Sequence, residues 1–563
     1  MKIVIVGGVA GGATAAARIR RLDETAEVVV FERSGYVSYA NCGLPYYVGG
    51  TIQDAGELTL QTPESFWERF RIRMQVRHEV RAIHPERKTV TVCALDTGEE
   101  FEEPYDKLLL SPGAMPTKLR LAGGDSDRVF TLRTVEDTLA IHTFIKEQAP
   151  KTAVLAGGGF ISLELAENLR KRGLEVTIVQ LDPQLLLPLD PEMAAFLHGE
   201  MRRNGVRLLL SHTVEGFQPR ANGVQVLLKD ADPIQADLVV MAIGVTPDTH
   251  LAKEAGLELG VRGSIVVNDQ METSVPDIYA VGDAVQVRQL VSGQETLVSL
   301  AGPANKQGRI AADNICGLDS RYTGALGSSV LKAFDLTVAA TGLNESAAKK
   351  AGIPCDKVYL SPASHAGYYP GGTVMTMKVL FQPETFRLLG AQIVGYDGVD
   401  KRIDVLATAI RAGLTGPELA ELDLAYAPPY SSAKDPVNMA GYMMENLRRG
   451  LLKQFFLEDA DALPRDGSVT LLDARTPQEF SGGTMEGFVN IPLDELRDRL
   501  DEIPRGKPVY VLCQSGLRSY LACRILSQRG YECRNFSGGY RLYQTVRQDR
   551  AAAKQARPCG MEL

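Results

Sequence analysis

The sequence predicts a multidomain α/β protein, because two glycine-rich turns each follow a short apolar strand and lead into a helix. The first strand, turn and helix occupy residues 2–22 and the second occupy residues 152–172; a further apolar run follows each, at 27–31 and 175–179. Two such strand–helix–strand units predict two nucleotide sites on doubly wound parallel sheets. A third compact α/β pattern begins at Val469.

Length and composition narrow the class of protein. At 563 residues the chain is too long for one core, and about 100–200 residues per domain gives three to five domains. The net charge of −8 argues against nucleic-acid binding, which needs a basic face. No apolar run approaches the roughly 18–20 residues of a membrane span, and residues 3–6 predict a buried strand rather than a signal peptide. Eight cysteines without a dense spacing pattern are typical of a reducing compartment. We therefore expect a cytoplasmic protein with no nucleic-acid or membrane partner and no metal site.

The first glycine turn, residues 7–12, reads GGVAGG. Glycines here permit a tight turn and let a pyrophosphate approach the positive end of the following helix. The pattern G-x-G-x-x-G would place a glycine at Val9, so the match is imperfect. Glu32 ends the next strand 25 residues after Gly7, where a carboxylate can hold ribose hydroxyls. The turn and the acid together predict a dinucleotide site.

The second turn, residues 157–162, reads GGGFIS, with Ser162 in the place of the third glycine. Gln180, rather than an acid, stands at the end of the next strand, and no arginine for a 2′-phosphate is evident there. The sequence favours NADH and leaves the choice between NADH and NADPH open. Further along, residues 273–283 read TSVPDIYAVGD and end a strand with an aspartate after glycine.

The order of these motifs resembles the pyridine nucleotide–disulfide oxidoreductases over roughly residues 1–441. The resemblance implies that the first unit holds FAD and the second NAD(P)H. It implies FAD contacts for Gly7, Gly8, Ala10, Gly11, Glu32, Arg33, Ser111, Gly113, Gly282 and Asp283. It implies NAD contacts for Gly157, Gly159, Phe160, Ile161, Glu164 and Gly244.

Cys42 stands in the segment 38–46, which reads SYANCGLPY. Two-cysteine reductases of this family carry C-x4-C, but the fifth residue after Cys42 is Tyr47, and the next cysteine is Cys93. Cys42 is therefore expected to work alone, through a mixed disulfide with substrate or a sulfenic acid. Flavin peroxidases and water-forming NADH oxidases carry a histidine in the first glycine turn, where this chain has Ala10.

The text NCGLPY at 41–46 instead resembles coenzyme A disulfide reductases. The resemblance implies that Ser38 and Asn41 contact the pantetheine arm of CoA, while residues of the first helix face its nucleotide. Arg18 and Arg21 are three residues apart on one face of that helix, where their charges can neutralise phosphates. The expected CoA contacts are Thr14, Arg18, Arg21, Ser38, Asn41, Asn305, Arg309 and Lys434.

An acid must protonate the thiol that leaves when Cys42 reacts. The last histidine is His365, so the C-terminal His–Glu pair of glutathione-reductase-type enzymes is missing. Residues 365–372 (HAGYYPGG) and 424–430 (LAYAPPY) resemble coenzyme A disulfide reductases, in which tyrosines of the dimer partner reach the active cysteine. The resemblance implies this catalytic role for Tyr368 and Tyr426, and hence a homodimer.

The third α/β unit contains a second reactive cysteine. Residues 513–519 read CQSGLRS, after a strand and before a helix, where backbone amides and the helix field favour the Cys513 thiolate. The spacing C-x4-R to Arg518 is shorter than the C-x5-R of a tyrosine phosphatase and fits a sulfane sulfur. With the segments around 472–475, 489–492 and 535–539, this unit resembles rhodaneses, although Thr484 stands where many have histidine. Cys559 shows no pattern that we can interpret.

The expected fold is α/β, with two Rossmann-like domains for FAD and NAD, an α+β dimerisation domain and a C-terminal α/β rhodanese domain. This order resembles fusions of coenzyme A disulfide reductase with rhodanese, also described as NADH-dependent persulfide reductases. Expected substrates are CoA persulfide, polysulfide or CoA disulfide, which the sequence does not rank. The alternatives are an NADH oxidase or peroxidase with a Cys42 sulfenate, and a rhodanese-based sulfur sensor with little turnover. Expected boundaries are 1–115 with 245–325 (FAD), 116–244 (NAD(P)H), 326–447 (dimerisation), 448–468 (linker), 469–550 (rhodanese) and 551–563 (tail).

Overall fold

The computed structural model describes residues 1–117 and 121–555, and the chain forms two compact units. Unit 1 consists of Met1–Pro183 and Gly205–Gly327, and unit 2 consists of Gln184–Asn204 and the chain from Ser328 onward. The segment Gln184–Asn204 falls in the range expected for the NAD(P)H domain, yet it belongs to unit 2. Of the expected tail, residues 556–563 with Cys559 lie outside the described residues.

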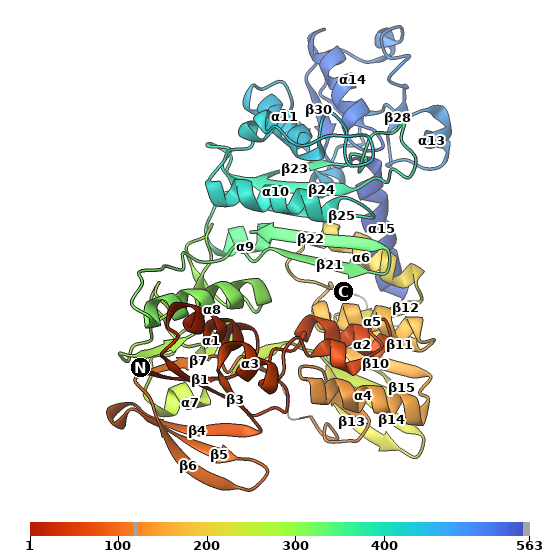
Figure 1. Ribbon diagram of the computed structural model, residues 1–563. Helices are drawn as coiled ribbons and strands as arrows, with labels where there is room; N and C mark the ends of the chain where they lie inside the picture. Colours follow the sequence, from red (N-terminus) through yellow and green to blue (C-terminus); the bar gives the residue numbers. More distant parts are fainter. Residues whose placement is uncertain (118–120, 556–563) are drawn as a thin grey trace. The chain divides into compact units, whose positions relative to one another are not determined.

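Strand β1 (Lys2–Val6) is the centre of a five-stranded parallel sheet in unit 1 (Figure 1). Ile3, Val4 and Ile5 are fully buried, as expected for a parallel strand covered on both faces. Helix α1 (Ala10–Leu22) follows the glycine turn and packs along α8 (Ala301–Ile315). The turn therefore lies at the carboxyl end of the central strand, where doubly wound sheets bind ligands. In spatial order the strands are β18 (Ile278–Ala280), β7 (Lys107–Leu110), β1, β2 (Glu27–Glu32) and β3 (Arg73–Val76).

A second five-stranded parallel sheet in unit 1 repeats this plan around β10 (Thr152–Ala156), which leads through its glycine turn into α5 (Phe160–Lys171). Its order is β12 (Val206–Leu210), β11 (Glu175–Gln180), β10, β16 (Leu238–Met241) and β9 (Val129–Thr131), with α4 (Val135–Gln148) after β9. The unit also contains two three-stranded antiparallel sheets: β4 (His78–His84), β5 (Thr89–Ala94) and β6 (Glu99–Pro104), and β13 (Val214–Arg220), β14 (Gly223–Leu228) and β15 (Ala231–Ala236). Shorter elements are α2 (Leu44–Gly49), α3 (Pro63–Phe70), α7 (His250–Glu254), β8 (Ala114–Pro116), β17 (Val245–Pro247), β19 (Val287–Arg288) and β20 (Glu295–Thr296).

Unit 2 contains a five-stranded antiparallel sheet whose inner strands β24 (Thr376–Phe381) and β25 (Leu388–Gly395) are buried along their whole length. Helices α10 (Val399–Ala412) and α6 (Pro191–Arg203) both pack on this sheet. The contact of α6 explains why residues 184–204 belong to this unit. The order is β21 (Ser329–Ala333), β22 (Leu336–Gly342), β25, β24 and β23 (Asp356–Leu360); α9 (Glu345–Lys350) and α11 (Pro436–Arg448) are further helices.

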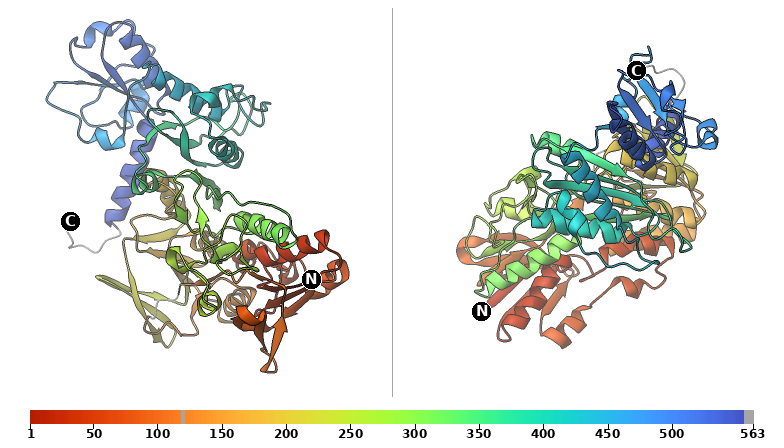
Figure 2. Two further views of the ribbon diagram at one scale, coloured as in Figure 1. Left: turned by 90° about the vertical axis from the view of Figure 1, so that its left-hand side faces the viewer. Right: turned by 90° about the horizontal axis from the view of Figure 1, so that it is seen from above.

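A five-stranded parallel sheet forms the rest of unit 2. The segment expected as a linker is folded instead, because β26 (Gln454–Phe455) joins this sheet and Phe455 is buried in its core. Helix α15 (Gly539–Gln555) leaves the sheet as a long helix (Figure 2) and packs along α6. Asp549 on α15 lies 2.9 Å from His198 and 2.5 Å from Arg202 on α6. The order is β26, β30 (Cys533–Phe536), β29 (Val509–Leu512), β27 (Thr470–Asp473) and β28 (Val489–Asn490), with helices α12 (Leu457–Ala460), α13 (Pro477–Ser481) and α14 (Leu517–Ser527).

Within residues 1–117 and 121–555, no helix has both the length and the apolar character that a membrane crossing requires.

Candidate active site

The first glycine turn is closely packed against its surroundings. Gly7 has a φ of +95°, and a Cβ atom there would lie 2.1 Å from the carbonyl oxygen of Ser111, so only glycine fits. A Cβ on Gly11 would lie 2.9 Å from Ser111 Oγ. Gly8 donates its backbone N–H to Glu32 Oε2 at 2.8 Å, and burial raises the pKa of that carboxyl group. The structure thus brings together the glycines, the serine and the acid expected around FAD.

Asp283, one of the residues expected to contact FAD, forms a 2.7 Å ion pair with Arg133. Sequence reasoning missed Arg133, because its partner is 150 residues away and no local spacing marks it. Gln307, a buried residue of α8, accepts a 2.7 Å hydrogen bond from the backbone N–H of Gly282 and fixes the turn before Asp283. Of the other expected residues, Ala10 begins α1, Gly113 and Gly282 have φ values of +72° and +83°, and Arg33 pairs with Asp248 at 2.8 Å.

The second glycine turn is tight at its start and open at its end. Gly157 has a φ of +111°, and a Cβ there would lie 2.3 Å from the carbonyl oxygen of Ala242. A Cβ on Gly159 would meet nothing within 4 Å, which leaves that side of the turn open to a ligand. Gln180 donates to Asp182 Oδ2 at 2.8 Å, so a carboxylate does stand at the end of β11, two residues beyond the expected place. Phe160 and Ile161 begin α5, and Gly244 has a φ of +113° with open space where its Cβ would be.

Cys42 lies in a 3-10 turn, Asn41–Gly43, directly before α2. The residue is exposed, yet the protein around its sulfur raises the pKa of the thiol, and the Glu164 carboxylate adds to this rise while Arg133 opposes it. Tyr46 Oη donates a long hydrogen bond of 3.4 Å to Glu164, and burial raises the pKa of Glu164 to about 7. A thiol near an acid that exchanges its proton around neutral pH can act as a nucleophile and later return a proton to a leaving thiol.

The residues expected to face CoA lie on two adjoining helices of unit 1. Thr14 on α1 donates a hydrogen bond to Asn305 on α8, and Arg18 forms a 2.7 Å ion pair with Asp313. Asp313 thus already neutralises Arg18, which weakens its expected role as a phosphate ligand. Arg21 and Arg309 are exposed on the same two helices; Ser38 has a φ of +47°, Asn41 is partly buried, and Lys434 is exposed in unit 2.

Tyr368 and Tyr426, both in unit 2, meet through their hydroxyl groups. Their oxygens are 2.6 Å apart, and the side chains are exposed. This hydrogen bond raises the pKa of Tyr426. The sequence placed each tyrosine by resemblance but did not predict that they form a pair.

Cys513 directly follows β29, and two hydrogen-bond donors approach its buried side chain. Its Sγ accepts hydrogen bonds of 3.1 Å from the backbone N–H of Gly516 and from Ser519 Oγ. These donors can stabilise a thiolate or a persulfide. Arg518 is bound by Glu479 through two bonds of 2.6 and 2.7 Å, and this pairing lowers the pKa of Glu479 to about 2. Ser519, which sequence reasoning did not assign, therefore contacts the sulfur, whereas Arg518 faces a carboxylate.

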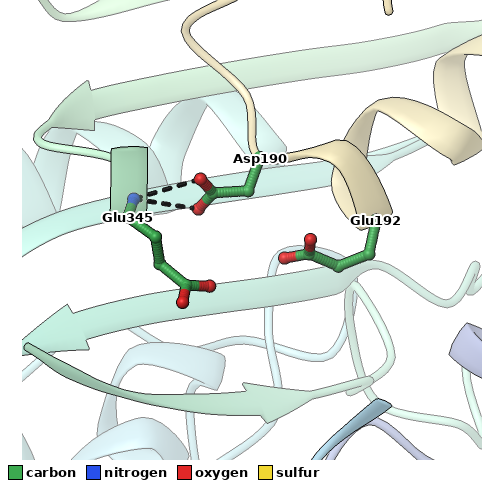
Figure 3. Close-up of side chains that lie close together, drawn as sticks. All are labelled: Asp190, Glu192 and Glu345. Atoms are coloured by element: carbon green, nitrogen blue, oxygen red, sulfur yellow. Dashed lines mark hydrogen bonds between the residues drawn. The ribbon is translucent and has the colours of Figure 1, made fainter. Parts of the chain in front are cut away.

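Within the described residues, one group of three acids lies close enough to hold a metal ion: Asp190, Glu192 and Glu345 (Figure 3). The ammonium of Lys378 stands among them, 2.6 Å from Asp190 and 2.5 Å from Glu192, and in contact with Glu345. Lys378 therefore supplies the cation that these carboxylates need, and the group carries no metal assignment.

Comparison with known proteins matches three family models to the chain. The pyridine nucleotide-disulphide oxidoreductase model matches residues 1–308, its dimerisation domain matches 329–436, and the rhodanese-like domain matches 456–545. A coenzyme A disulfide reductase of Staphylococcus aureus (strain JH9) is 39% identical over 442 residues, which cover 78% of this chain and 99% of that protein.

Two solved structures resemble nearly the whole chain. The reduced CoADR-RHD of Bacillus anthracis is 48% identical with a TM-score of 0.95, covering 98% of both chains. An NAD-dependent persulfide reductase from A. fulgidus is 37% identical with a TM-score of 0.91, covering 96% of this chain and 100% of that one. These matches confirm the expected fold class. The family uses FAD and NAD(P)H, which the two glycine turns fit. The chain therefore belongs to the pyridine nucleotide-disulphide oxidoreductase family and carries a rhodanese-like domain after its dimerisation domain.

Proposed function

We propose that this protein is an NADH-dependent reductase of CoA persulfide, polysulfide or CoA disulfide, with Cys42 as the redox cysteine and Cys513 as the carrier of sulfane sulfur. The observation that carries the proposal is the environment of the buried Cys513. Its sulfur accepts hydrogen bonds from the backbone N–H of Gly516 and from the hydroxyl of Ser519. The chain also has an exposed thiol, Cys42, near Glu164. Cys513 would therefore carry the sulfur, and Cys42 would reduce it. The named activities of the coenzyme A disulfide and persulfide reductases that it resembles support the substrate class.

The sulfur chemistry at Cys42 balances with NADH as the source of electrons. The thiolate attacks the CoA-bound sulfur of a CoA persulfide, the S–S bond breaks, hydrosulfide leaves, and a mixed disulfide of Cys42 with CoA forms. Two electrons and a proton then convert the mixed disulfide to the Cys42 thiolate and the CoA thiol. FAD and NADH, when bound, supply these two electrons. Glu164, with its pKa near 7, can hold a proton close to Cys42 at neutral pH.

Residues on the two turns would hold the cofactors. The turn that begins at Gly7, with Glu32, would bind FAD, and the turn that begins at Gly157 would bind the nicotinamide nucleotide. Asp182 supports NADH over NADPH, because a carboxylate at the end of β11 would repel a 2′-phosphate and can accept ribose hydroxyls. Asp182→Ala should therefore lower the ratio of the activity with NADH to the activity with NADPH.

We also propose a homodimer in the cytoplasm. The match to a dimerisation domain supports the dimer, and the seven cysteines of the described residues are all free, which suits a reducing compartment. If the partner's tyrosines complete each site, mixed subunits will show it. A heterodimer of a Cys42→Ser subunit and a Tyr368→Phe/Tyr426→Phe subunit then has one intact site, and random mixing restores about one quarter of wild-type activity. A mixture no more active than either parent would refute the shared site.

The two cysteine roles are tested with single variants. Cys42→Ser should keep the fold and flavin but lose NADH-dependent reduction of every sulfur substrate. Cys513→Ser should lose sulfur transfer from thiosulfate or polysulfide but keep reduction of preformed CoA persulfide, because its loop has donors for a persulfide and no source of electrons. Cys316→Ser, at the partly buried end of α8, is the matched control.

NADH consumption with each substrate in turn gives the readout. Wild-type persulfide reduction by Cys42→Ser would refute the mechanism. If oxygen or peroxide is turned over faster than the sulfur substrates, and Cys513→Ser leaves this rate unchanged, the result would instead favour an oxidase or peroxidase.

A further inference from the structure

One buried arginine contacts both segments that carry the tyrosine pair. Arg402 lies on α10, and its side chain is only 1% exposed. It donates to the carbonyl oxygen of Ser364 at 2.9 Å and to that of Tyr430 at 3.1 Å. Ser364 is four residues before Tyr368, and Tyr430 is four residues after Tyr426. A single guanidinium therefore joins the two tyrosine-bearing segments.

The arginine is itself fixed by a buried carboxylate. Asp435 accepts from Arg402 Nε at 3.2 Å and Nη2 at 3.1 Å, and also from Ser431 Oγ at 2.7 Å and the backbone N–H of Val437 at 2.9 Å. The latter bond makes Asp435 the N-cap of α11. Gly398 is needed as well, because a Cβ there would lie 2.1 Å from Arg402 Nη1. The geometry of Arg402 is thus set by α10 and α11 together.

The two segments also bond to each other directly. The backbone N–H of Ala366 donates to the carbonyl oxygen of Ser431 at 3.0 Å, next to the point where Arg402 Nη2 meets Ser431 Oγ at 3.0 Å. Beyond this junction the chain runs outward to the exposed tyrosines, whose oxygens are 2.6 Å apart. A hydrogen bond between the hydroxyls of two exposed tyrosines requires that the backbone of both segments is held in place. Otherwise the loss of side-chain rotamer entropy would oppose the bond.

We propose that Arg402 is the positioning residue that holds the segments of Tyr368 and Tyr426 together, so that their two hydroxyls act as one hydrogen-bonded acid. The inference rests on the function proposed above, together with the role that the resemblance implies for these tyrosines, as the acid that protonates the thiol leaving Cys42. Two hydroxyls that share one hydrogen bond leave one proton free to donate. The raised pKa of Tyr426 agrees with Tyr426 as the donor within the pair and Tyr368 as the donor to the substrate.

Arginine suits this place better than lysine. Its planar guanidinium carries N–H donors on three nitrogens in fixed directions. Here Nη2 lies against the carbonyl oxygens of Ser364 and Tyr430, Nη1 donates to the carbonyl oxygen of Gly398, and Nε donates to Asp435. A lysine would keep the charge next to Asp435, but its single nitrogen cannot replace the bonds that three guanidinium nitrogens make to both segments and to α10 and α11. The charge and the positioning role can therefore be separated by substitution.

The test uses the full chain with its cofactors and compares Arg402→Lys with the pair Arg402→Gln/Asp435→Asn, which removes both buried charges at once. Asp404→Asn, an exposed change on the same helix, is the control. Both Arg402 variants should lower kcat for CoA persulfide by about tenfold to a hundredfold and leave KM for NADH unchanged, because lost acid catalysis affects the chemical step. Circular dichroism and flavin content identify any variant that fails to fold, and the second variant then decides.

A further comparison separates positioning from general destabilisation. If Arg402 acts through the tyrosines, Arg402→Lys in a Tyr368→Phe/Tyr426→Phe background should cause no further loss of kcat. The ionisation of Tyr426, obtained as the difference between each protein and its Tyr426→Phe derivative, should move to lower pH in Arg402→Lys, because the hydrogen bond that raises its pKa is lost.

The outcomes are distinguishable. Additive losses, or an unchanged Tyr426 titration in a variant with reduced kcat, would overturn the positioning role alone. Wild-type activity in both Arg402 variants would do the same. Wild-type activity in Tyr368→Phe/Tyr426→Phe would overturn the tyrosine role in the proposed function, and this inference with it.

Discussion

The replacement of Lys378 by methionine should destabilise unit 2 strongly. Lys378 is fully buried on β24, and its ammonium contacts Asp190, Glu192 and Glu345. Methionine has a similar length but no charge, so the variant leaves three carboxylates facing one another. Of the remaining cations, Lys357 still reaches Glu345 at 2.9 Å.

The expected cost follows from the burial of these groups. Removal of one partner from a buried ion pair typically costs about 3–5 kcal/mol, because the other charge remains without compensation. Asp190 is 3% exposed and cannot be rehydrated, whereas Glu345 is 36% exposed and keeps Lys357, so solvent screening reduces its share. We therefore expect a loss of about 3–5 kcal/mol at neutral pH, most of it from Asp190 and Glu192.

The loss should depend on pH with a definite sign. Burial already raises the pKa of Asp190 while Lys378 opposes that rise, so the pKa rises further in the variant. A carboxyl group with a raised folded-state pKa destabilises the protein when it is ionised, and the penalty disappears as the pH falls through that raised pKa. The difference between variant and wild type should therefore shrink in mildly acidic solution.

The assay needs a local probe, because a chain with two compact units need not unfold in one step. The single tryptophan, Trp67, lies on α3 in unit 1, so its fluorescence reports unit 1 and serves as an internal reference. Hydrogen exchange of peptides from β24 and α9 reports unit 2. The exposed Lys350→Met on α9 is the matched control. Wild-type protection of β24 in Lys378→Met at neutral pH would refute the reasoning.

Three further predictions concern the site itself. Gly7→Ala should yield folded protein without FAD, because the added Cβ would lie 2.1 Å from a backbone carbonyl oxygen and distort the glycine turn. Loss of the visible flavin absorbance measures this, and retained flavin would contradict the role of the turn in FAD binding. Glu164→Gln should lower the pKa of Cys42, so alkylation of that thiol should accelerate at lower pH than in wild type, and an unshifted profile would exclude the carboxylate as a cause. Glu479→Gln should cost about 1 kcal/mol after solvent screening. The Arg518 pairing lowers the pKa of Glu479 to about 2, so this stability is present above the ordinary glutamate pKa and lost as the pH falls toward 2; chemical denaturation at several pH values measures it.

Local motifs predicted those parts of the site whose residues lie in one turn or one strand–helix–strand unit. Gly7 and Glu32 are 25 residues apart in one strand–helix–strand unit, and the structure joins them through the backbone of Gly8. Cys513 and its donor Gly516 belong to one loop. In each case the ligand or the sulfur requires a turn of fixed geometry, and a fixed turn leaves a fixed spacing in the sequence.

Contacts between distant segments left no such spacing. Arg133 meets Asp283 150 residues further on, and Lys378 meets Asp190 188 residues earlier. The segment Gln184–Asn204 belongs to unit 2 because α6 packs on a sheet whose strands begin more than a hundred residues later. Periodicity marks α6 as a helix but does not say which sheet it covers.

Arg402 shows that some of these supports do leave a signal of another kind. The buried face of α10 comprises Val399, Arg402, Ile403, Leu406, Ala409 and Ile410. These positions follow the i, i+3, i+4, i+7 pattern of an apolar stripe with one arginine inside it. A guanidinium on such a stripe must find acceptors for its donors inside the protein, since an unpaired buried charge is very costly. An arginine at an apolar position therefore predicts a buried hub, although not its partners. The carbonyl groups that satisfy it belong to the loops that pack on the same helix, and here those loops carry Tyr368 and Tyr426.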